Sequence, residues 1–380
     1  MVARLAGFAA ALAVAASGVG TATAAEAPEI AAAAGILIDA SDGKILWEKD
    51  ARVQRAPAST TKILTALVVL EHAAPSEIVT VSARAEAIGE RTFVGASDLD
   101  LLRGEQRSVI ELLYGLLLPS ANDAAVALAE HVAGSEQAFV ELMNRKAAAL
   151  GAADSRFANS HGLDADGHHS TARDLALLGR EAMSDEQFRD VAAARSFLLP
   201  GHRSRPARRI ENRNLLLESY EGADGVKTGT TRRAGNSVVA SATRQGERRL
   251  AVVLGGSSDA LGEAATLLDY GFENFHRTVL VPNGVWGYAT FGNGSTAEIR
   301  SASAVTVLAA DTAPTAEVSF DAENSVLEIR TSSSVRRVSA SVRCLAPPCG
   351  FDKRAAESPF LWMVELIAPL ARFLEQLGSF

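Results

Sequence analysis

Cysteine is scarce in this chain and positive charge is in deficit, and each shortage excludes a class of protein. Two cysteines, Cys344 and Cys349, occur among 380 residues. No histidine lies near them, and two thiolates alone do not fill a zinc site. The spacing would instead suit a small disulfide loop in an exported protein. The formal net charge of −8 and the lack of a basic aromatic patch argue against nucleic-acid binding.

The apolar runs at the two ends of the chain are too short to span a bilayer. At the N-terminus, Arg4 precedes the apolar segment Leu5–Ala16, and Ala22-Thr23-Ala24 has the small residues of a cleavage site. We therefore predict that residues 1–25 are a signal peptide and that the protein is exported, to the periplasm or the outer face of the cytoplasmic membrane. A buried N-terminal helix is the alternative, and the Ala/Gly/Thr-rich tail disfavours it. Neither cysteine follows this segment, so a lipoprotein anchor is not indicated.

Residues 356–380 are predicted to form an amphipathic helix. The apolar residues on one face of this helix are Phe360, Met363, Val364, Ile367, Leu370, Leu374 and Leu377. The helix either lies in the membrane interface as a monotopic anchor or docks on the protein itself. Pro369 would kink it, and it lacks the Lys/Arg face expected for anionic lipid. We predict peripheral attachment to the membrane surface.

Hairpin signals stand at both ends of the first 275 residues, with helical patterns between them. GILIDASDGKILWEKD and NSVVASATRQGERRLAVVLGG each combine two strand-like runs with turn residues. Helices are predicted over the ranges Ser108–Leu117, Asp123–Val132, Glu136–Leu150, Thr171–Met183 and Gly262–Asn274. This order predicts an α+β unit, residues 26–275, in which helices pack on an antiparallel sheet. Short β-type runs without a helix signal predict a small, separate all-β domain at residues 276–350.

Ser59-Thr60-Thr61-Lys62 opens a helical pattern in APASTTKILTALVVLEH. Residues three apart share one face of a helix, so Ser59 and Lys62 would present a hydroxyl beside an amine. A serine hydroxyl becomes a nucleophile when a neighbouring base takes its proton, and a neutral lysine can be that base. Backbone N–H groups at the helix start could stabilise an oxyanion. An isolated S-x-x-K, however, is usually a capping serine with a solvated lysine one turn on.

Two further short motifs follow along the chain. Ser120 and Asn122, in LPSAND, lie between two predicted helices and could both point into one cleft, although plain helix capping is the alternative. In the K-T-G motif, Lys227 would offer a fixed cation and Gly229 would let a substrate backbone approach a strand edge, although a surface turn is the alternative. The occurrence of S-x-x-K, S-x-N and K-T-G in this order favours an acyl-transfer site over three unrelated matches.

The three motifs together resemble those of the penicillin-interacting serine enzymes. Longer segments, among them ELLYGLLLPSANDAAVALAEHV, ANSHGLDADGHHSTARDLALLGREAM and GADGVKTGTT, are similar to the D-alanyl-D-alanine carboxypeptidases, which are low-molecular-mass penicillin-binding proteins. The likeness covers most of residues 30–275. It implies the penicillin-binding, β-lactamase-like transpeptidase fold, followed by a β domain and an amphipathic anchor. It also implies peptidoglycan stem peptides as substrates and β-lactams as covalent inhibitors, with no metal or cofactor.

The resemblance implies a role for each motif residue. Ser59 would be acylated, with Lys62 as its base, and burial together with the nearby charge of Lys227 would make Lys62 neutral. Ser120 would pass a proton to the leaving amine, and Asn122 would orient the substrate amide. The backbone N–H groups of Ser59 and Thr230 would form the oxyanion hole. The substrate-binding residues would be Lys227, Thr228, Gly229, Thr230 and Arg213.

One departure from the family concerns the terminal carboxylate of the substrate. Family members commonly carry an arginine after the last core strand, but Ser257–Gly262 contains none. Either Arg232 or Arg233 substitutes for that arginine, or recognition of the carboxylate is weakened.

The motifs leave other functions open. An endopeptidase acting on peptidoglycan cross-links would use the same chemistry, and a non-catalytic wall-binding protein could use the same fold. A class A β-lactamase needs a glutamate between the second and third motifs, and the corresponding segment SHGLDADGHHST has none. Within this segment we expect His161 to be a structural histidine rather than a base, and His168 and His169 to be exposed loop residues.

Overall fold

The computed structural model describes residues 26–89, 97–202, 205–256, 258–281, 283–290, 296–310, 316–321, 326–331 and 335–344. Contacts divide these residues into two units, one of Glu26–Glu273 and one that begins at Asn274. The predicted signal peptide, the predicted C-terminal helix and Cys349 lie outside the described residues.

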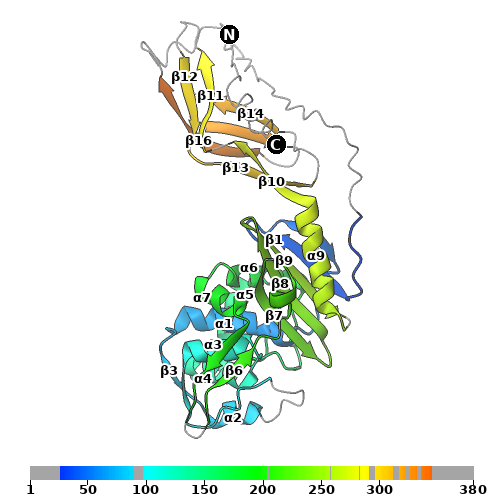
Figure 1. Ribbon diagram of the computed structural model, residues 1–380, viewed down its shortest axis with the longest axis vertical. Coiled ribbons are helices and arrows are strands. Elements are labelled where there is room, and N and C mark those ends of the chain that lie inside the picture. The colour runs from blue at the N-terminus through cyan, green and yellow to red at the C-terminus, as the bar shows by residue number, and fades with distance from the viewer. Residues whose placement is uncertain are drawn as a thin grey trace, which may run out of the picture. The chain divides into compact units, whose positions relative to one another are not determined.

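The larger unit is built on a five-stranded antiparallel sheet with the strand order β2-β1-β9-β8-β7 (Figure 1). The strands are β1 (Ala34–Asp39), β2 (Ile45–Lys49), β7 (Ala223–Thr231), β8 (Gly235–Arg244) and β9 (Glu247–Gly256). Both predicted hairpins are present, as β1–β2 and β8–β9. Because β1 also pairs with β9, the two ends of this unit meet in the middle of the sheet, and β7 is left at an edge.

Helices cover both faces of this sheet (Figure 1). The long helix α9 (Ala260–Asn274) lies on one face. The helices of the other side are α1 (Lys62–His72), α3 (Val109–Leu117), α4 (Asn122–Ala133), α5 (Glu136–Ala149), α6 (Ala172–Ala182) and α7 (Glu186–Ala193). Shorter elements are the 3₁₀ turn η1 (Ala58–Thr61), α2 (Ala83–Gly89) and α8 (Leu216–Ser219). Two small two-stranded sheets pair β3 (Ile78–Thr80) with β4 (Gln106–Ser108) and β5 (Ser196–Leu199) with β6 (Arg208–Glu211).

Side chains of the central strands alternate between two hydrophobic cores. In β1, Ile36 and Ile38 pack into the core on the helix-rich side, whereas Leu37 packs against α9. In β9, Val252 faces the first core and Val253 the second. Successive side chains of a strand point to opposite faces, so a strand buried on both faces is a continuous apolar run. This explains why β8 and β9 lack the apolar–polar alternation of a half-exposed strand.

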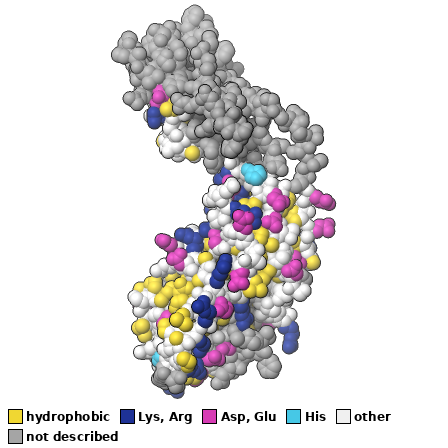
Figure 2. Space-filling view, in the orientation of Figure 1, with side chains coloured by type: hydrophobic (Ala, Val, Ile, Leu, Met, Phe, Trp, Pro, Cys, Tyr) yellow, Lys and Arg dark blue, Asp and Glu magenta, His cyan; other side chains and the backbone are white. Residues whose placement is uncertain are grey.

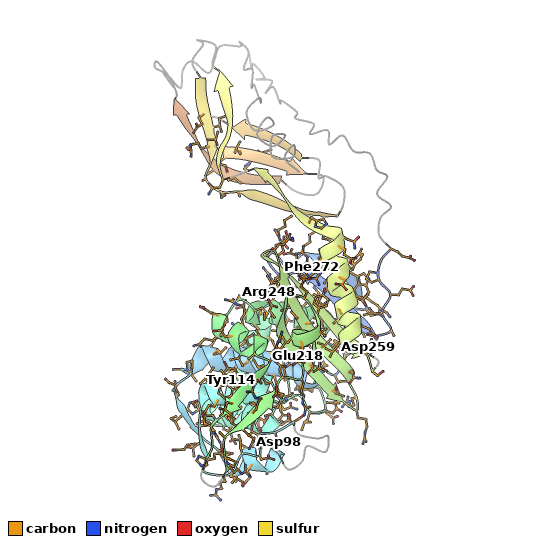
Figure 3. The ribbon with its side chains drawn as sticks, in the orientation of Figure 1. Asp98, Tyr114, Glu218, Arg248, Asp259 and Phe272 are labelled. Atoms are coloured by element: carbon orange, nitrogen blue, oxygen red, sulfur yellow. The ribbon has the colours of Figure 1, made fainter. Side chains whose placement is uncertain are left out.

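A buried ion pair links β1 to β9, and its arginine also contacts α9. The guanidinium of Arg249 lies 2.7 Å from the carboxylate of Asp39 and 2.6 Å from that of Glu247, and the Arg249 side chain is fully buried. Arg249 also lies over the ring of Phe272, 5.5 Å from its centroid; Figure 3 labels Phe272 on α9. On the helix-rich side, the ring of Tyr114 in α3 stacks on Phe197 of β5 with 4.0 Å between centroids (Tyr114 is labelled in Figure 3). These contacts were not predictable from motif spacing.

The described part of the smaller unit contains strands and no helix. Strand β10 (Phe275–Val281) pairs with β13 (Val305–Ala310). A five-stranded antiparallel sheet has the order β11-β12-β16-β15-β14, formed by β11 (Gly284–Thr290), β12 (Thr296–Ser301), β14 (Ala316–Asp321), β15 (Val326–Thr331) and β16 (Val335–Cys344). The predicted α+β class is thus confirmed, and the short runs read as β-type do form strands.

The predicted helices of the larger unit begin and end within two residues of the observed ones. Strands β10 and β12, the helices α2, α7 and α8, and the two small two-stranded sheets were not predicted. Over the described ranges, no helix combines the length and the hydrophobicity that crossing a bilayer requires.

Candidate active site

Ser59 lies in a strained turn that leads into α1. The preceding residue, Ala58, has φ of 52°, a left-handed conformation that residues with a β-carbon rarely adopt. The turn is held by Thr60, whose hydroxyl donates to the Pro57 carbonyl at 2.6 Å. Ser59 is half-buried, so its hydroxyl can be reached from outside. Strain of this kind persists only where the surroundings fix it, and it is frequent at functional sites.

The amine of Lys62 is fully buried and donates to three oxygens. Its Nζ lies 3.1 Å from Ser59 Oγ and 2.7 Å from Asn122 Oδ1, and it also donates to the backbone carbonyl of His161. A neutral amine keeps two protons and one lone pair. If Asn122 and His161 accept the two protons, the lone pair faces Ser59. The arrangement can therefore remove a proton from the Ser59 hydroxyl.

The electrostatic surroundings favour the neutral form of Lys62. Burial lowers its pKa well below the ordinary value, and the cations of Lys227 and Arg213 lower it further, whereas Asp123 raises it. Both predicted causes, desolvation and a neighbouring lysine, are present, and desolvation is the larger.

Ser120 lies in the turn between α3 and α4, and its backbone is strained as well, with φ of 70°. Its side chain is buried, and its Oγ has no hydrogen-bond partner among the described residues. Asn122, at the start of α4, donates its backbone N–H to the carbonyl of Ser97 at 2.8 Å and accepts from Lys62. A buried hydroxyl without a partner is unfavourable in the free protein, so Ser120 is available to a bound molecule.

The third motif lies on β7, the edge strand of the sheet. Lys227 is buried, and its Nζ donates to the Thr228 carbonyl at 3.0 Å. Burial, with a contribution from Arg213, lowers the pKa of Lys227 to about 7. Thr228 is half-buried, and Thr230 is exposed with its hydroxyl donating to Asn236 Oδ1 at 2.8 Å.

Gly229 brings β7 into contact with the turn that carries Ser59. A β-carbon at Gly229 would lie 2.8 Å from the backbone nitrogen of Ser59 and 3.1 Å from that of Thr60. Real β-carbons do not approach so closely, so the strand and the turn can meet only through a glycine. The sequence predicted that Gly229 makes room for a substrate; in the structure it makes room for the turn of Ser59.

The arginines expected near the substrate carboxylate have different surroundings. Arg213 donates from Nη1 to Ser97 Oγ at 3.0 Å, and its charge acts on both Lys62 and Lys227. Arg232, in the turn that follows β7, is exposed, and its side chain makes no hydrogen bond or ion pair within the described part of the chain. Arg233 is bound: its backbone N–H donates to Asp164 at 3.2 Å and its guanidinium lies 3.8 Å from Asp166.

The prediction that His168 and His169 are exposed was wrong, and His169 is half-buried. His168 was expected to be exposed; it is buried, its Nε2 lies 2.9 Å from Thr61 Oγ1, and its Nδ1 accepts from the N–H of Ala158. Through Nε2 the ring bonds Thr61 of η1 and through Nδ1 it bonds Ala158, so His168 links the Ser59 turn to the segment after α5. His161 is buried as well and contributes its backbone carbonyl to Lys62.

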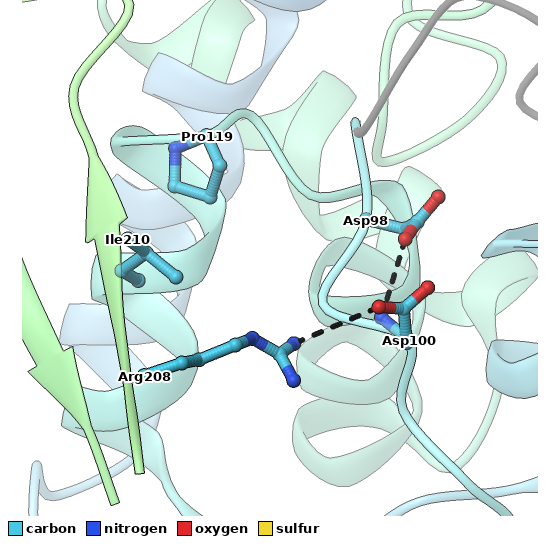
Figure 4. Close-up of a pocket in the computed structure, with 5 residues that line it drawn as sticks. All are labelled: Asp98, Asp100, Pro119, Arg208 and Ile210. Atoms are coloured by element: carbon cyan, nitrogen blue, oxygen red, sulfur yellow. Dashed lines mark hydrogen bonds and ion pairs between the residues drawn. The ribbon is translucent and has the colours of Figure 1, made fainter. Parts of the chain in front are cut away.

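A cavity of about 390 Å³ lies next to the Ser120 turn (Figure 4). It is lined by Asp98, Asp100, Pro119, Arg208 and Ile210. Asp100 N donates to Asp98 Oδ1 at 3.2 Å, and the guanidinium of Arg208 lies 4.0 Å from Asp100. The cavity adjoins the second motif through Pro119, and its charged lining residues are two aspartates and one arginine.

Possible metal ligands and surface charge were compared over the part of the chain that the structure describes. Over the residues that the structure describes, no three His, Cys, Asp or Glu side chains gather as metal ligands. On the face of the larger unit drawn in Figure 2, acidic and basic side chains are interspersed.

Comparisons of the sequence with known proteins agree with one another on the family. A model of the D-alanyl-D-alanine carboxypeptidase family matches residues 21–258. The chain is 41% identical over 260 residues to D-alanyl-D-alanine carboxypeptidase DacC of Escherichia coli (strain K12), which covers 66% of the chain and 63% of DacC. It is 40% identical over 267 residues to DacD of the same organism, which covers 68% of the chain and 67% of DacD. The match to DacC thus spans less than two thirds of that relative's length.

Two solved structures share the fold over a larger part of their own length. Penicillin binding protein 6B from Escherichia coli superimposes with a TM-score of 0.68 at 32% identity, covering 84% of this chain and 97% of that one. A mutant of the Streptomyces K15 DD-transpeptidase superimposes with a TM-score of 0.62 at 32% identity, covering 65% of this chain and all of the other.

Proposed function

The chain belongs to the D-alanyl-D-alanine carboxypeptidase family, and from that premise we propose that it removes the terminal D-alanine of peptidoglycan stem peptides through an acyl-enzyme at Ser59. The observation that carries the proposal is the position of Lys62. Its fully buried Nζ lies 3.1 Å from Ser59 Oγ, and burial lowers its pKa well below the ordinary value. A general base must lie within hydrogen-bond reach of the proton that it takes and must be unprotonated, and both observations support that role for Lys62.

In the proposed mechanism, Lys62 takes the proton of the Ser59 hydroxyl as Oγ attacks the carbonyl between the two D-alanines. The oxyanion is stabilised by the backbone N–H groups of Ser59 and Thr230, and each such donor is worth on the order of a hundredfold in rate. Ser120 relays the proton from Lys62 to the leaving amine, which departs as free D-alanine, and the unpartnered Ser120 hydroxyl supports that role. Water then hydrolyses the ester, which releases the shortened peptide as a carboxylic acid and regenerates the Ser59 hydroxyl.

Asn122 has a double role in this scheme. Its Oδ1 accepts from Lys62 in the free protein. Its amide N–H₂ is the group that would bind the substrate carbonyl, since an asparagine side chain both donates and accepts. The substrate backbone would lie along β7, because an edge strand can accept an extended peptide as an added strand.

Lys227, Thr228 and Thr230 are proposed to hold the terminal carboxylate, with Arg213 adding positive charge. Among the two arginines that could replace the one missing after the last core strand, Arg232 is the better candidate. Its side chain has no hydrogen bond or ion pair among the described residues, whereas Arg233 is bound to Asp164 and Asp166.

Labelling with a fluorescent penicillin tests the proposal. The wild-type protein should form a stable covalent adduct, and Ser59→Ala should form none while keeping its fold by circular dichroism. A folded wild-type protein without an adduct would contradict acylation at Ser59. Release of D-alanine from a pentapeptide then distinguishes a carboxypeptidase from an endopeptidase, which cleaves cross-linked dimers, and from a non-catalytic binder, which cleaves neither.

We also propose that the protein is exported and held at the outer face of the cytoplasmic membrane by residues 356–380. The support is the sequence pattern of the two ends. Deleting residues 356–380 should move the protein from the membrane fraction to the supernatant and leave its penicillin-acylation rate unchanged. If the truncated protein still sediments with membranes, this anchor does not operate.

A further inference from the structure

A buried carboxylate outside the three motifs holds the loop that contacts Lys62. Glu136, in the first turn of α5, has a side chain that is 6% exposed. Its Oε1 accepts from the backbone N–H of Ser160 at 3.1 Å and from the Ser160 hydroxyl at 2.8 Å. The same oxygen lies 3.5 Å from Nε2 of His161, and Oε2 lies 2.5 Å from the guanidinium of Arg84.

Hydrogen bonds fix the His161 ring in one tautomer. Its Nδ1 accepts from the backbone N–H of Leu163 at 3.1 Å, so Nδ1 carries no proton. In the neutral ring the proton is therefore on Nε2, which faces the Glu136 carboxylate. Burial lowers the pKa of His161 to about 3, so the ring is neutral over the range in which the protein would work. Glu136 thus contacts both residues 160 and 161.

The carbonyl of His161 is consequently held from several directions. The Ser160 carbonyl accepts from Thr65 Oγ1 at 2.6 Å, and the N–H of Gly162 donates to Asn159 Oδ1 at 2.7 Å. Gly162 has φ of +91°, and a β-carbon there would lie 2.0 Å from the Ala58 carbonyl. The loop is therefore pressed against the turn of Ser59, and its position fixes where the His161 carbonyl meets Lys62.

We propose that Glu136 is a positioning residue: by gripping Ser160 and His161, it aims the His161 carbonyl at Lys62 and so directs the lone pair of that amine at Ser59. The proposal rests on the proposed function, in which Lys62 is the base. Glu136 does not touch Lys62 and acts only through the loop. Its own charge is balanced by Arg84, so it differs from the charged groups that act on Lys62 directly, namely Lys227, Arg213 and Asp123.

The test combines a titration with a rate. The chain has six lysines, so protein labelled with ¹³C at lysine Cε gives a simple spectrum in which Lys62 can be assigned by its loss in Lys62→Arg. In Glu136→Ala, the His161 carbonyl is held less firmly against the amine of Lys62. The pH midpoint of the Lys62 Cε signal should therefore shift by about half a unit or more. The rate constant of penicillin acylation should fall about tenfold or more, because the base is misaligned.

Two variants separate positioning from stability. Ser135 is the N-cap of α5, and its Oγ accepts from the N–H of Ala138 at 3.2 Å. Ser135→Ala should lower the melting temperature by weakening the same helix end, yet leave the Lys62 titration and the acylation rate unchanged. Glu136→Gln keeps an oxygen for Ser160 and should restore the rate to within about threefold of wild type.

The proposal is overturned if Glu136→Ala leaves the Lys62 midpoint and the acylation rate as in wild type, if Ser135→Ala reproduces its effects, or if Glu136→Gln is as slow as Glu136→Ala. Should Glu136→Ala fail to fold, Ser160→Ala removes one of the two bonds to Oε1 and should shift the Lys62 midpoint in the same direction by less. A wild-type protein that penicillin does not acylate would refute the proposed function, while the titration alone would still decide whether Glu136 positions Lys62.

Discussion

Gly229 and Ser59 are in backbone contact, because a β-carbon on Gly229 would stand 2.8 Å from the Ser59 nitrogen. One residue belongs to the edge strand β7 and the other to the turn before α1, 170 positions earlier in the chain (229 minus 59). The contact sets the distance between the nucleophile and the strand that would carry the substrate. The close approach of β7 to Ser59 therefore depends on the absence of a side chain at Gly229.

Gly229→Ala should separate these two elements. The added methyl must push either β7 or the Ser59 turn, and overpacking of this kind costs about 1–3 kcal/mol in the free energy of unfolding. Penicillin acylation should fall by about a hundredfold or more, because the Ser59 and Thr230 N–H groups no longer converge on one oxyanion. The measurements are denaturant unfolding and the second-order acylation rate constant.

Gly179→Ala is the matched control. A β-carbon there would lie 3.0 Å from Val239 Cγ1 and 3.1 Å from Leu250 Cδ1, in the core on the helix-rich side of the sheet. The free energy of unfolding of Gly179→Ala should fall by about as much as that of Gly229→Ala, whereas its acylation rate should stay within about twofold of wild type. Equal losses of activity in the two variants would show that Gly229 acts through stability alone.

The pH dependence of acylation should report the charges around Lys62. Lys62 must be neutral to act, so the rate should rise with pH through its pKa, which burial and then Lys227 and Arg213 place below the ordinary value. Arg213→Gln removes a permanent cation, favours the protonated amine and should move the rising limb to higher pH, by several tenths of a unit to about one unit. Wild type and variant are compared by the pH midpoint of the rising limb and not by the rate itself, because Arg213 is also proposed to contribute to substrate binding. An unchanged midpoint, or a shift to lower pH, would contradict the assignment of the limb to Lys62.

The sequence was sufficient to predict the α+β class and the three motifs, for a physical reason. Helical periodicity, two-residue alternation and turn residues are local, and S-x-x-K places its serine and lysine on one face within a single turn. The structure adds that Lys62 joins the first two motifs directly, through its bond to Asn122.

What could not be predicted depends on contacts between distant segments. Glu136 looks like an ordinary acidic residue in the first turn of a helix, and only the fold brings it to Ser160 and His161. His168 was expected to be exposed because it lies in a polar loop, but its ring is covered when the loop packs behind η1. Neither position has a local pattern that reveals its partner.

Arg232 and Arg233 should differ in their effect on substrates that carry a terminal carboxylate. Arg232→Gln should raise KM for a D-alanyl-D-alanine pentapeptide by about three- to tenfold, since a charged hydrogen bond to an accessible carboxylate is worth about 1 kcal/mol. Arg233→Gln is the adjacent control: its guanidinium already faces Asp166, so KM should change by less than about twofold. Steady-state kinetics with the pentapeptide and with its C-terminal amide test this, because the amide should not distinguish Arg232→Gln from wild type. If Arg233→Gln has the larger effect on KM, the assignment is reversed.

His168 should make the stability of the protein fall in acid. Burial, with a contribution from His169, lowers its pKa from 6.5 to about 4. The folded state therefore holds it neutral between these values while the unfolded state binds a proton, so the free energy of unfolding decreases as the pH falls from about 6.5 to about 4. Over that range the contribution approaches 3 kcal/mol as an order of magnitude.

Comparison with His168→Gln isolates this contribution. At pH 8 the histidine is neutral in both states, so the stability gap between wild type and variant reports only the lost bonds to Thr61 and Ala158. Towards pH 4.5 the gap should narrow by about 2–3 kcal/mol, because the wild type alone carries the cost of keeping the ring unprotonated. His161 titrates alike in both proteins and cancels from the difference. Denaturant unfolding at four or five pH values measures the gap, and a gap that stays constant with pH would mean that His168 is protonated in the folded state as readily as in the unfolded one.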